Sequence, residues 1–222
     1  MKRTRNNPSQ PQQPQETFQL KPNPNILSID AGFTHLGWAV FSNDIPINVG
    51  VIGNRKVDNK ITVVSNKYQI MASFMTRSLR DIYIENKCVA MIGELPHGGG
   101  KSSNAVAHMN MSTAIVGSVI ALMDIPFEAC TPSDVKIATF GKGDASKDDM
   151  MARIISIFDG TIDEKIVQVK KTKKNPKGFR RDRIFHLCGK EFHANNFEHI
   201  ADACGAYLAL VDGNLIKMFG GK

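Results

Sequence analysis

The chain has 222 residues, 42% of them hydrophobic, so it can bury one substantial core but is too short for two large lobes. Its formal net charge is +7, and the positive charge is concentrated in two segments. The first 25 residues are basic, and residues 170–183 carry eight lysines and arginines against one aspartate. A mildly acidic body with two basic appendages favours a polyanionic partner over a generally basic protein.

Apolar and polar patterning predicts a series of strands and helices after a disordered tail. Residues 1–24 are rich in Pro, Gln and Asn and have almost no large apolar residues, which is typical of disorder. Strands are expected at residues 26–30, 37–41, 47–52, 88–93 and 127–130. Helices are expected at residues 66–85 and 103–123, just after Thr131, at 146–158 and at 196–212. Strands followed by alternating helices and strands indicate a mixed α/β layer structure, predicted as one domain over residues 25–215.

An insertion at about residues 160–195 differs in character from the rest of the chain. Residues 165–170 and 183–187 flank the turn signal Asn175-Pro176-Lys177-Gly178. The pattern predicts a basic β-hairpin, or alternatively a long loop, that projects from the body.

The cysteines and the apolar runs bear on where the protein works. Cys88, Cys130, Cys188 and Cys204 are scattered with no Cys-x-x-Cys pair, which is typical of a reducing compartment inside the cell, the cytoplasm or nucleoid. No apolar stretch is expected to reach the ~20 residues of a membrane span, so no membrane partner is expected. The N-terminus continues into Pro and Gln, which argues against a secretory signal.

Two of the expected strands end on a carboxylate, Asp30 and Glu94, and a late helix carries His199 and Asp202 three residues apart on one face. Alone, Asp30 is explained by a turn and Glu94 by a solvated loop. Together, the four residues suit Mg²⁺, which prefers oxygen ligands. Two ions about 4 Å apart can stabilise both the attacking and the leaving oxygen of a phosphodiester. The sequence therefore predicts a two-metal nuclease site.

The chain resembles the RuvC-type Holliday-junction resolvases of the RNase H-like nuclease superfamily over residues 26–158 and 196–212. The matching stretches are Ile26-Leu-Ser-Ile-Asp30-Ala-Gly32 with Gly37-Trp-Ala-Val-Phe41, then Ile92-Gly-Glu94, residues 131–147, and residues 199–210. Ala31 stands where the family usually has proline, a change that leaves the acid intact. The N-terminal tail and the 160–195 insertion have no counterpart in the short family members.

The resemblance implies an RNase H-like mixed sheet flanked by helices and a metal-dependent crossover junction endodeoxyribonuclease that acts in DNA recombination and repair. It implies a homodimer that cuts four-way or other branched DNA, with Mg²⁺, or Mn²⁺ in its place, as two ions per active site. The implied ligands and catalytic residues are Asp30, Glu94, His199 and Asp202, with Lys136 and Lys147 as the functional lysines. Glu198 lies on the same helix face as Asp202 and is a rival to His199.

Basic side chains are expected to contact the DNA backbone. These are Lys101, Lys136, Lys147, Lys170, Lys171, Lys173, Lys174, Arg180 and Arg181. The segment Gly98-Gly99-Gly100-Lys101-Ser102 resembles a phosphate loop, but Leu95 stands where the first glycine is required, which excludes ATP binding there. His186, Cys188 and His193 lack zinc-finger spacing.

Two other functions compete with the nuclease. One is a branched-DNA-binding protein without catalysis. All four site positions hold residues that are competent for catalysis, which argues against this alternative. The other is a phosphotransferase of the actin-like class, because residues 30–34 fit its first phosphate loop; that class needs two lobes and a second such loop. By analogy, the small size and the basic arm suit a gene of a phage or mobile element.

Overall fold

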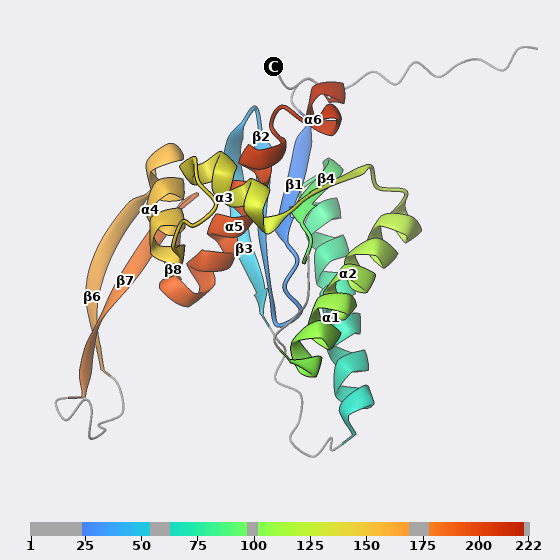
Figure 1. The fold of residues 1–222 in the computed structure, drawn as a ribbon, viewed down its shortest axis with the longest axis horizontal. Helices are drawn as coiled ribbons and strands as arrows, with labels where there is room; N and C mark the ends of the chain where they lie inside the picture. The colour runs from blue at the N-terminus through green and yellow to red at the C-terminus, as the bar shows by residue number, and fades with distance from the viewer. Residues whose placement is uncertain (1–23, 54–62, 97–101, 169–177, 220–222) are drawn as a thin grey trace, which may run out of the picture.

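The computed structural model of the protein describes residues 24–53, 63–96, 102–168 and 178–219. Its centre is a five-stranded sheet with the strand order β3-β2-β1-β4-β5 (Figure 1). The strands are β1 (Asn25–Asp30), β2 (His35–Ser42), β3 (Ile45–Gly53), β4 (Cys88–Glu94) and β5 (Phe127–Cys130). Because β1 pairs antiparallel with β2 and parallel with β4, the predicted mixed sheet is confirmed.

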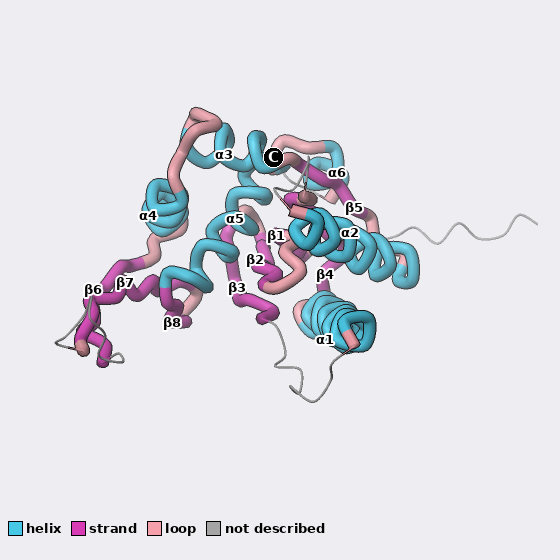
Figure 2. The backbone as a smooth tube through the Cα atoms, turned by 60° about the horizontal axis from the view of Figure 1, so that its bottom comes forward, coloured by secondary structure: helices cyan, strands magenta, loops and turns pink. Residues whose placement is uncertain are grey.

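Helices cover both faces of this sheet. They are α1 (Val64–Glu85), α2 (Ser103–Met123), α3 (Pro132–Phe140), α4 (Lys147–Ile157), α5 (Ala194–Leu210) and α6 (Asn214–Met218). Figure 2 shows α5 on one side of the sheet and α1 and α2 on the other. The short α6 was not expected from the sequence.

The first strand shows how the sequence separates the two faces. Its side chains alternate, so Ile26 and Ser28 face α5, whereas Leu27 and Ile29 face α1 and α2. The Ser28 hydroxyl donates to the Ala203 carbonyl oxygen at 2.6 Å, which pairs a buried polar group with the backbone of α5. The same alternation points the last residue of β1, Asp30, toward α5.

Local sequence signals explain several element boundaries. Asn43 and Asp44 both have positive φ and join β2 to β3, as the left-handed residues of a tight hairpin do. Helices α3 and α4 each begin with a capping box, formed by Thr131 with Asp134 and by Ser146 with Asp149. These two starts were expected from the sequence.

A second sheet of three antiparallel strands extends from the body (Figure 1). Its strands are β6 (Thr161–Gln168), β7 (Phe179–Leu187) and β8 (Lys190–His193). The antiparallel pairing of β6 with β7 confirms the hairpin alternative for the insertion. Strand β8 was missed because it is four residues long and largely polar; it follows β7 after Cys188 and Gly189, which both have positive φ.

The expectation about apolar runs was wrong for α2. This helix contains no Asp, Glu, Lys or Arg and is long and apolar enough, by length and composition alone, to cross a membrane. Its buried side, which includes Ile115, Val116 and Val119, belongs to the core shared with α1, while most of the helix is not buried.

All four cysteines are free; Cys188 is partly buried and the other three are buried. The expected N-terminal tail lies outside the described residues.

Candidate active site

The two strand-ending acids lie next to each other. In the parallel pairing of β1 with β4, Asp30 is the register partner of Glu94, and the Ala31 amide donates to the Glu94 carbonyl oxygen at 3.2 Å. Ser28 and Ile92 are partners two residues earlier and face α5. Because side chains alternate along a strand, both carboxylates point to the α5 side of the sheet.

Helix α5 approaches the sheet closely at this edge because Gly37 has no side chain. A Cβ atom at residue 37 would lie 2.0 Å from the His199 carbonyl oxygen, so any larger residue would push α5 outward. A second contact of this kind occurs at Gly205, where a Cβ would meet Val135 and Thr139 of α3. Gly37 of β2 and Gly205 of α5 therefore allow the close packing that brings His199 and Asp202 near the edge of the sheet.

A direct hydrogen bond joins α5 to β1. His199 Nδ1 lies 2.9 Å from Asp30 Oδ2, and because an ionised carboxylate only accepts, the imidazole donates through Nδ1. Burial alone would lower the pKa of His199. The hydrogen bond to Asp30 and the charges of Asp30, Glu198 and Asp202 outweigh it, so the pKa is raised. The sequence placed these residues in one site without indicating this bond.

Three carboxylates are close enough to repel one another. Burial, followed by the charges of Asp30 and Asp202, raises the pKa of Glu94 to about 8. Burial and the charge of Asp30 raise the pKa of Asp202 to about 7. Perturbed carboxyl groups that share a partly buried location are typical of functional sites. We call Asp30, Glu94 and Asp202 the carboxylate cluster.

The two expected lysines lie close enough to the carboxylate cluster to affect different members of it. The positive charge of Lys136, on α3, lowers the pKa of Glu94 against the other contributions. The positive charge of Lys147, at the start of α4, likewise lowers the pKa of Asp202 against the other contributions. The Nζ atom of Lys147 lies 3.0 Å from Glu198 Oε2. Glu198 Oε1 in turn lies 3.6 Å from His199 Nε2. Glu198 therefore bridges Lys147 and His199, whereas the sequence had suggested it only as a rival ligand.

One residue at the site was missed by sequence reasoning. The His35 ring stacks on the His199 ring with centroids 5.4 Å apart and planes 10° apart. A single histidine at the start of β2 has no spacing or motif that points to a site. The stack gives His199 one neighbour that holds its ring plane, while Asp30 fixes its Nδ1.

The residues present suit a divalent cation in charge and in donor type. Carboxylate oxygens are the ligands that Mg²⁺ prefers, and a cation would relieve the repulsion that raises the pKa of Glu94 and Asp202. Within the ranges that the structure describes, no three Asp, Glu, His or Cys side chains are drawn together tightly enough to form a ready-made metal site. The carboxylate cluster with His199 therefore supplies the ligand types, and side-chain adjustment is needed to complete the geometry.

The remaining expected DNA contacts lie elsewhere. Arg180 and Arg181 are on β7, away from the carboxylate cluster, where they line a separate cavity. Lys101, Lys170, Lys171, Lys173 and Lys174 lie outside the described residues, so their contacts with DNA stay predictions.

The fold was compared with known proteins. No family model matches the sequence, and no curated protein matches it. Among solved structures, RuvC of Thermus thermophilus aligns with a TM-score of 0.54 at 14% identity, over 87% of this chain and 96% of that one. The same protein in complex with a Holliday junction substrate aligns with a TM-score of 0.54 at 14% identity, over 84% and 92% of the two chains.

A third structure comes from a eukaryote. The yeast mitochondrial Holliday junction resolvase Ydc2 aligns with a TM-score of 0.50 at 13% identity, over 91% of this chain and 87% of that one. At such low identity the likeness shows the fold alone. The chain thus has the α/β architecture expected from its sequence, a mixed five-stranded sheet flanked by helices, and it shares this fold with RuvC and Ydc2, which are Holliday junction resolvases.

Proposed function

We propose that this protein is a metal-dependent endonuclease that cuts four-way and other branched DNA junctions. The observation that carries the proposal is the meeting of Asp30, Glu94 and Asp202 at one edge of the sheet, with raised pKa values at Glu94 and Asp202. The fold likeness to RuvC and Ydc2 supports the same reading, since both are junction resolvases and RuvC has been seen with its junction substrate.

The chain's own residues would divide the work. Asp30, Glu94, Asp202 and His199 would hold two Mg²⁺ ions, which when bound lower the pKa of a water and neutralise charge on the phosphate. Asp30 also orients the His199 ring through Nδ1, so that Nε2 is the nitrogen left to bind a ligand or accept a proton. Lys136, near Glu94, and Lys147, near Asp202, would contact phosphate oxygens beside the carboxylate cluster.

Two symmetric nicks across a junction require two active sites, so we propose a homodimer. The exposed face of α2 supports this proposal. Leu122 is 80% exposed and Val106 is 38% exposed, and the helix has no Asp, Glu, Lys or Arg that a partner would have to desolvate. A second copy that packs this face would bury apolar surface that one protomer leaves in water.

The test is a cleavage assay with a labelled immobile four-way junction beside a linear duplex of the same sequence. We expect paired symmetric nicks in the junction, only when Mg²⁺ or Mn²⁺ is present. Equal cutting of the duplex would keep the nuclease and remove the junction selectivity. Tight junction binding without cleavage in either metal would instead favour the alternative of a binding protein that lacks catalysis.

A further inference from the structure

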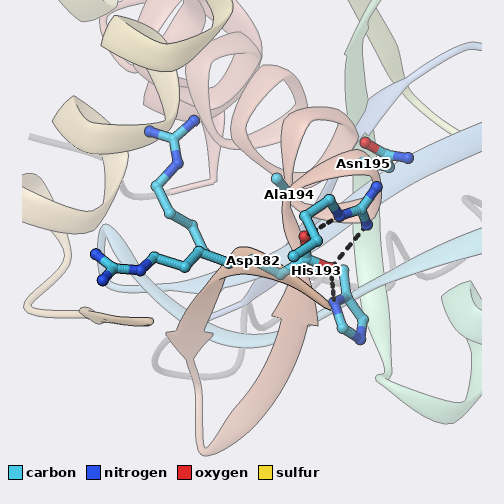
Figure 3. Close-up of a pocket in the computed structure, with 7 residues that line it drawn as sticks. Asp182, His193, Ala194 and Asn195 are labelled. Carbon is cyan, nitrogen blue, oxygen red and sulfur yellow. Dashed lines mark hydrogen bonds and ion pairs between the residues drawn. The ribbon is translucent and has the colours of Figure 1, made fainter. Parts of the chain in front are cut away.

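A cavity of about 570 Å³ lies where β7 meets the first turn of α5, outside the carboxylate cluster (Figure 3). Its lining residues are Arg180, Arg181, Asp182, Arg183, His193, Ala194 and Asn195. Three arginines and one aspartate line the cavity, so its lining carries a net positive charge at neutral pH. Of these three arginines, only Arg180 pairs with that aspartate, Asp182. This cavity belongs to the insertion and takes no part in the proposed cleavage chemistry.

Two arginines of the cavity are hydrogen-bonded to carboxylates, and Arg181 makes a longer, exposed ion pair. Arg180 binds Asp182 through two hydrogen bonds of 2.5 and 2.8 Å, and Arg183 pairs with Asp148 at the start of α4. Arg181 is 78% exposed and only 3.8 Å from Glu164. A guanidinium has five N–H donors, so one carboxylate leaves donors for a further anion. The hydrogen bonds of Arg180 and Arg183 orient these two side chains before binding, which reduces the entropy that a ligand must overcome.

We propose that this arginine-lined cavity binds a backbone phosphate of the DNA strand that is cut in the carboxylate cluster. The inference rests on the proposed function. The guanidinium fork matches the geometry of phosphate oxygens. Six of the seven residues that line the cavity carry polar or charged side chains, and three of these are arginines, so the hydrogen-bond donors of the lining favour an anion. The occupant that fits this lining is therefore a phosphate.

The placement of α5 supports a role on the same strand. Asn195 lines the cavity, and the helical rise of ~1.5 Å per residue puts His199 ~6 Å and Asp202 ~10 Å further along the axis. Phosphates along one strand of a duplex are ~3.4 Å apart in the axial direction, so a strand that follows α5 would place a phosphate about two or three nucleotides from the cut in the cavity.

The first turn of α4 spans the same interval. Lys147 pairs with Glu198 beside the carboxylate cluster, and the next residue, Asp148, pairs with Arg183 in the cavity. Two consecutive residues of α4 therefore connect the carboxylate cluster to the arginines of the cavity. This arrangement sets the distance between the two phosphate positions.

The test measures which phosphate the cavity recognises. Five four-way junctions would each carry one neutral methylphosphonate, placed at one of the first five positions from the mapped cut. The affinity of each junction would be measured without metal for wild type and for the double variant Arg180→Gln/Arg181→Gln. We expect wild type to lose affinity at one position, about two or three nucleotides from the cut. The double variant should be insensitive at that position, and its plot of log affinity against log salt should be shallower by ~0.9.

The matched control is Arg77→Gln, which removes one exposed charge from α1 on the other face of the sheet. It should keep both the position-specific loss and the salt slope. The single variant Arg181→Gln, at a well-exposed side chain, serves if the double variant does not fold. Equal losses in wild type and variant at every position, or the same change of slope in Arg77→Gln, would overturn the proposal. If wild type binds no junction, both the phosphate proposal and the proposed function would be overturned. If wild type binds and cuts the junction without a position-specific loss of affinity, only the phosphate proposal for the cavity would be overturned.

Discussion

Asp30 and Glu94 are register partners at the carboxyl ends of two adjacent parallel strands, so their carboxylates lie on the same side of one sheet edge. Among the described residues, the only basic side chain that hydrogen-bonds to either acid is His199, which binds Asp30. Two adjacent, partly buried acids without a matching cation are costly for stability alone. Their pairing is instead expected of a site that is completed by a ligand.

Asp30→Asn is expected to separate binding from cleavage. The amide is isosteric and keeps an oxygen for His199 Nδ1, but it removes the charge that a cation requires. We expect near-normal affinity for a four-way junction and a cleavage rate at least ~10²-fold lower, measured in single-turnover assays. Unchanged cleavage would remove Asp30 from the site.

The carboxylate cluster should make stability depend on pH in an unusual direction. The pKa values of Glu94 and Asp202 are raised in the folded protein to about 8 and about 7, and that of His199 is also raised. The folded state therefore binds more protons than the unfolded state between about pH 4 and 8, and the free energy of unfolding contributed by these groups falls as pH rises.

Thermal unfolding followed by circular dichroism at pH 5 and pH 8 would measure this effect. Without metal we expect a lower Tm at pH 8, and we expect Mg²⁺ to raise the Tm at pH 8 more than at pH 5, because protonated carboxyl groups bind it poorly. Asp202→Asn should reduce both differences. A Tm that rises from pH 5 to pH 8 in wild type and variant alike would contradict the assignment.

Lys147 and Glu198 are expected to act as a pair. Lys147→Gln removes a charge that we propose contacts phosphate, so cleavage should fall about tenfold or more with the fold intact. Glu198→Gln leaves Lys147 in place but removes its partner at 3.0 Å, so a smaller loss is expected. The double variant should be no worse than Lys147→Gln. Additive losses in this double-mutant cycle would show that the two side chains act independently.

Leu122→Glu is expected to disrupt a homodimer that forms through α2. The side chain is 80% exposed in one protomer, so the change should leave the fold of that protomer nearly unaffected. Sedimentation velocity should show a dimer for wild type and a monomer for the variant at the same concentration. Glu85, an exposed position on α1, offers the control Glu85→Gln. A monomeric wild type would remove the proposed interface.

Gly37→Ala should destabilise the protein although it adds one methyl group. The new Cβ would lie 2.0 Å from the His199 carbonyl oxygen, a backbone atom that cannot rotate away. Overpacking of this kind costs ~1–3 kcal/mol, which corresponds to a Tm lower by several degrees. Gly143→Ala is the control, because its Cβ would meet Ser133 Oγ at an ordinary 3.6 Å. Equal Tm values for the two variants would contradict the close approach of α5.

The strands and most helices were predictable because the signals that define them are local. Strand β1 is an apolar run that ends on Asp30, and α4 starts at a capping box, so neither depends on distant residues. The alternation along β1 even predicts which face Asp30 occupies once the partner helix is known. The grouping of Asp30 and Glu94 with His199 and Asp202 came from the residue types at the element ends and from the family resemblance.

The relationships that were not predictable depend on contacts between distant segments. The stack of His35 on His199 and the close approach at Gly37 arise where α5 crosses β2, and no spacing within either segment records that crossing. Strand β8 forms only because β7 offers an edge to a short polar segment. The apolar length of α2 was underestimated because Asn and Ser interrupt it without adding charge.

The hydrogen bond between Asp30 and His199 joins residues 169 positions apart. Contacts of such long sequence separation form late, because the loop they close is large. During synthesis on the ribosome, β1 and β4 emerge well before α5, so a nascent chain carries two of the three carboxylates and no helix to complete them. The proposed cutting activity is thereby tied to completion of the fold, and a partly made chain poses no hazard to the DNA around it.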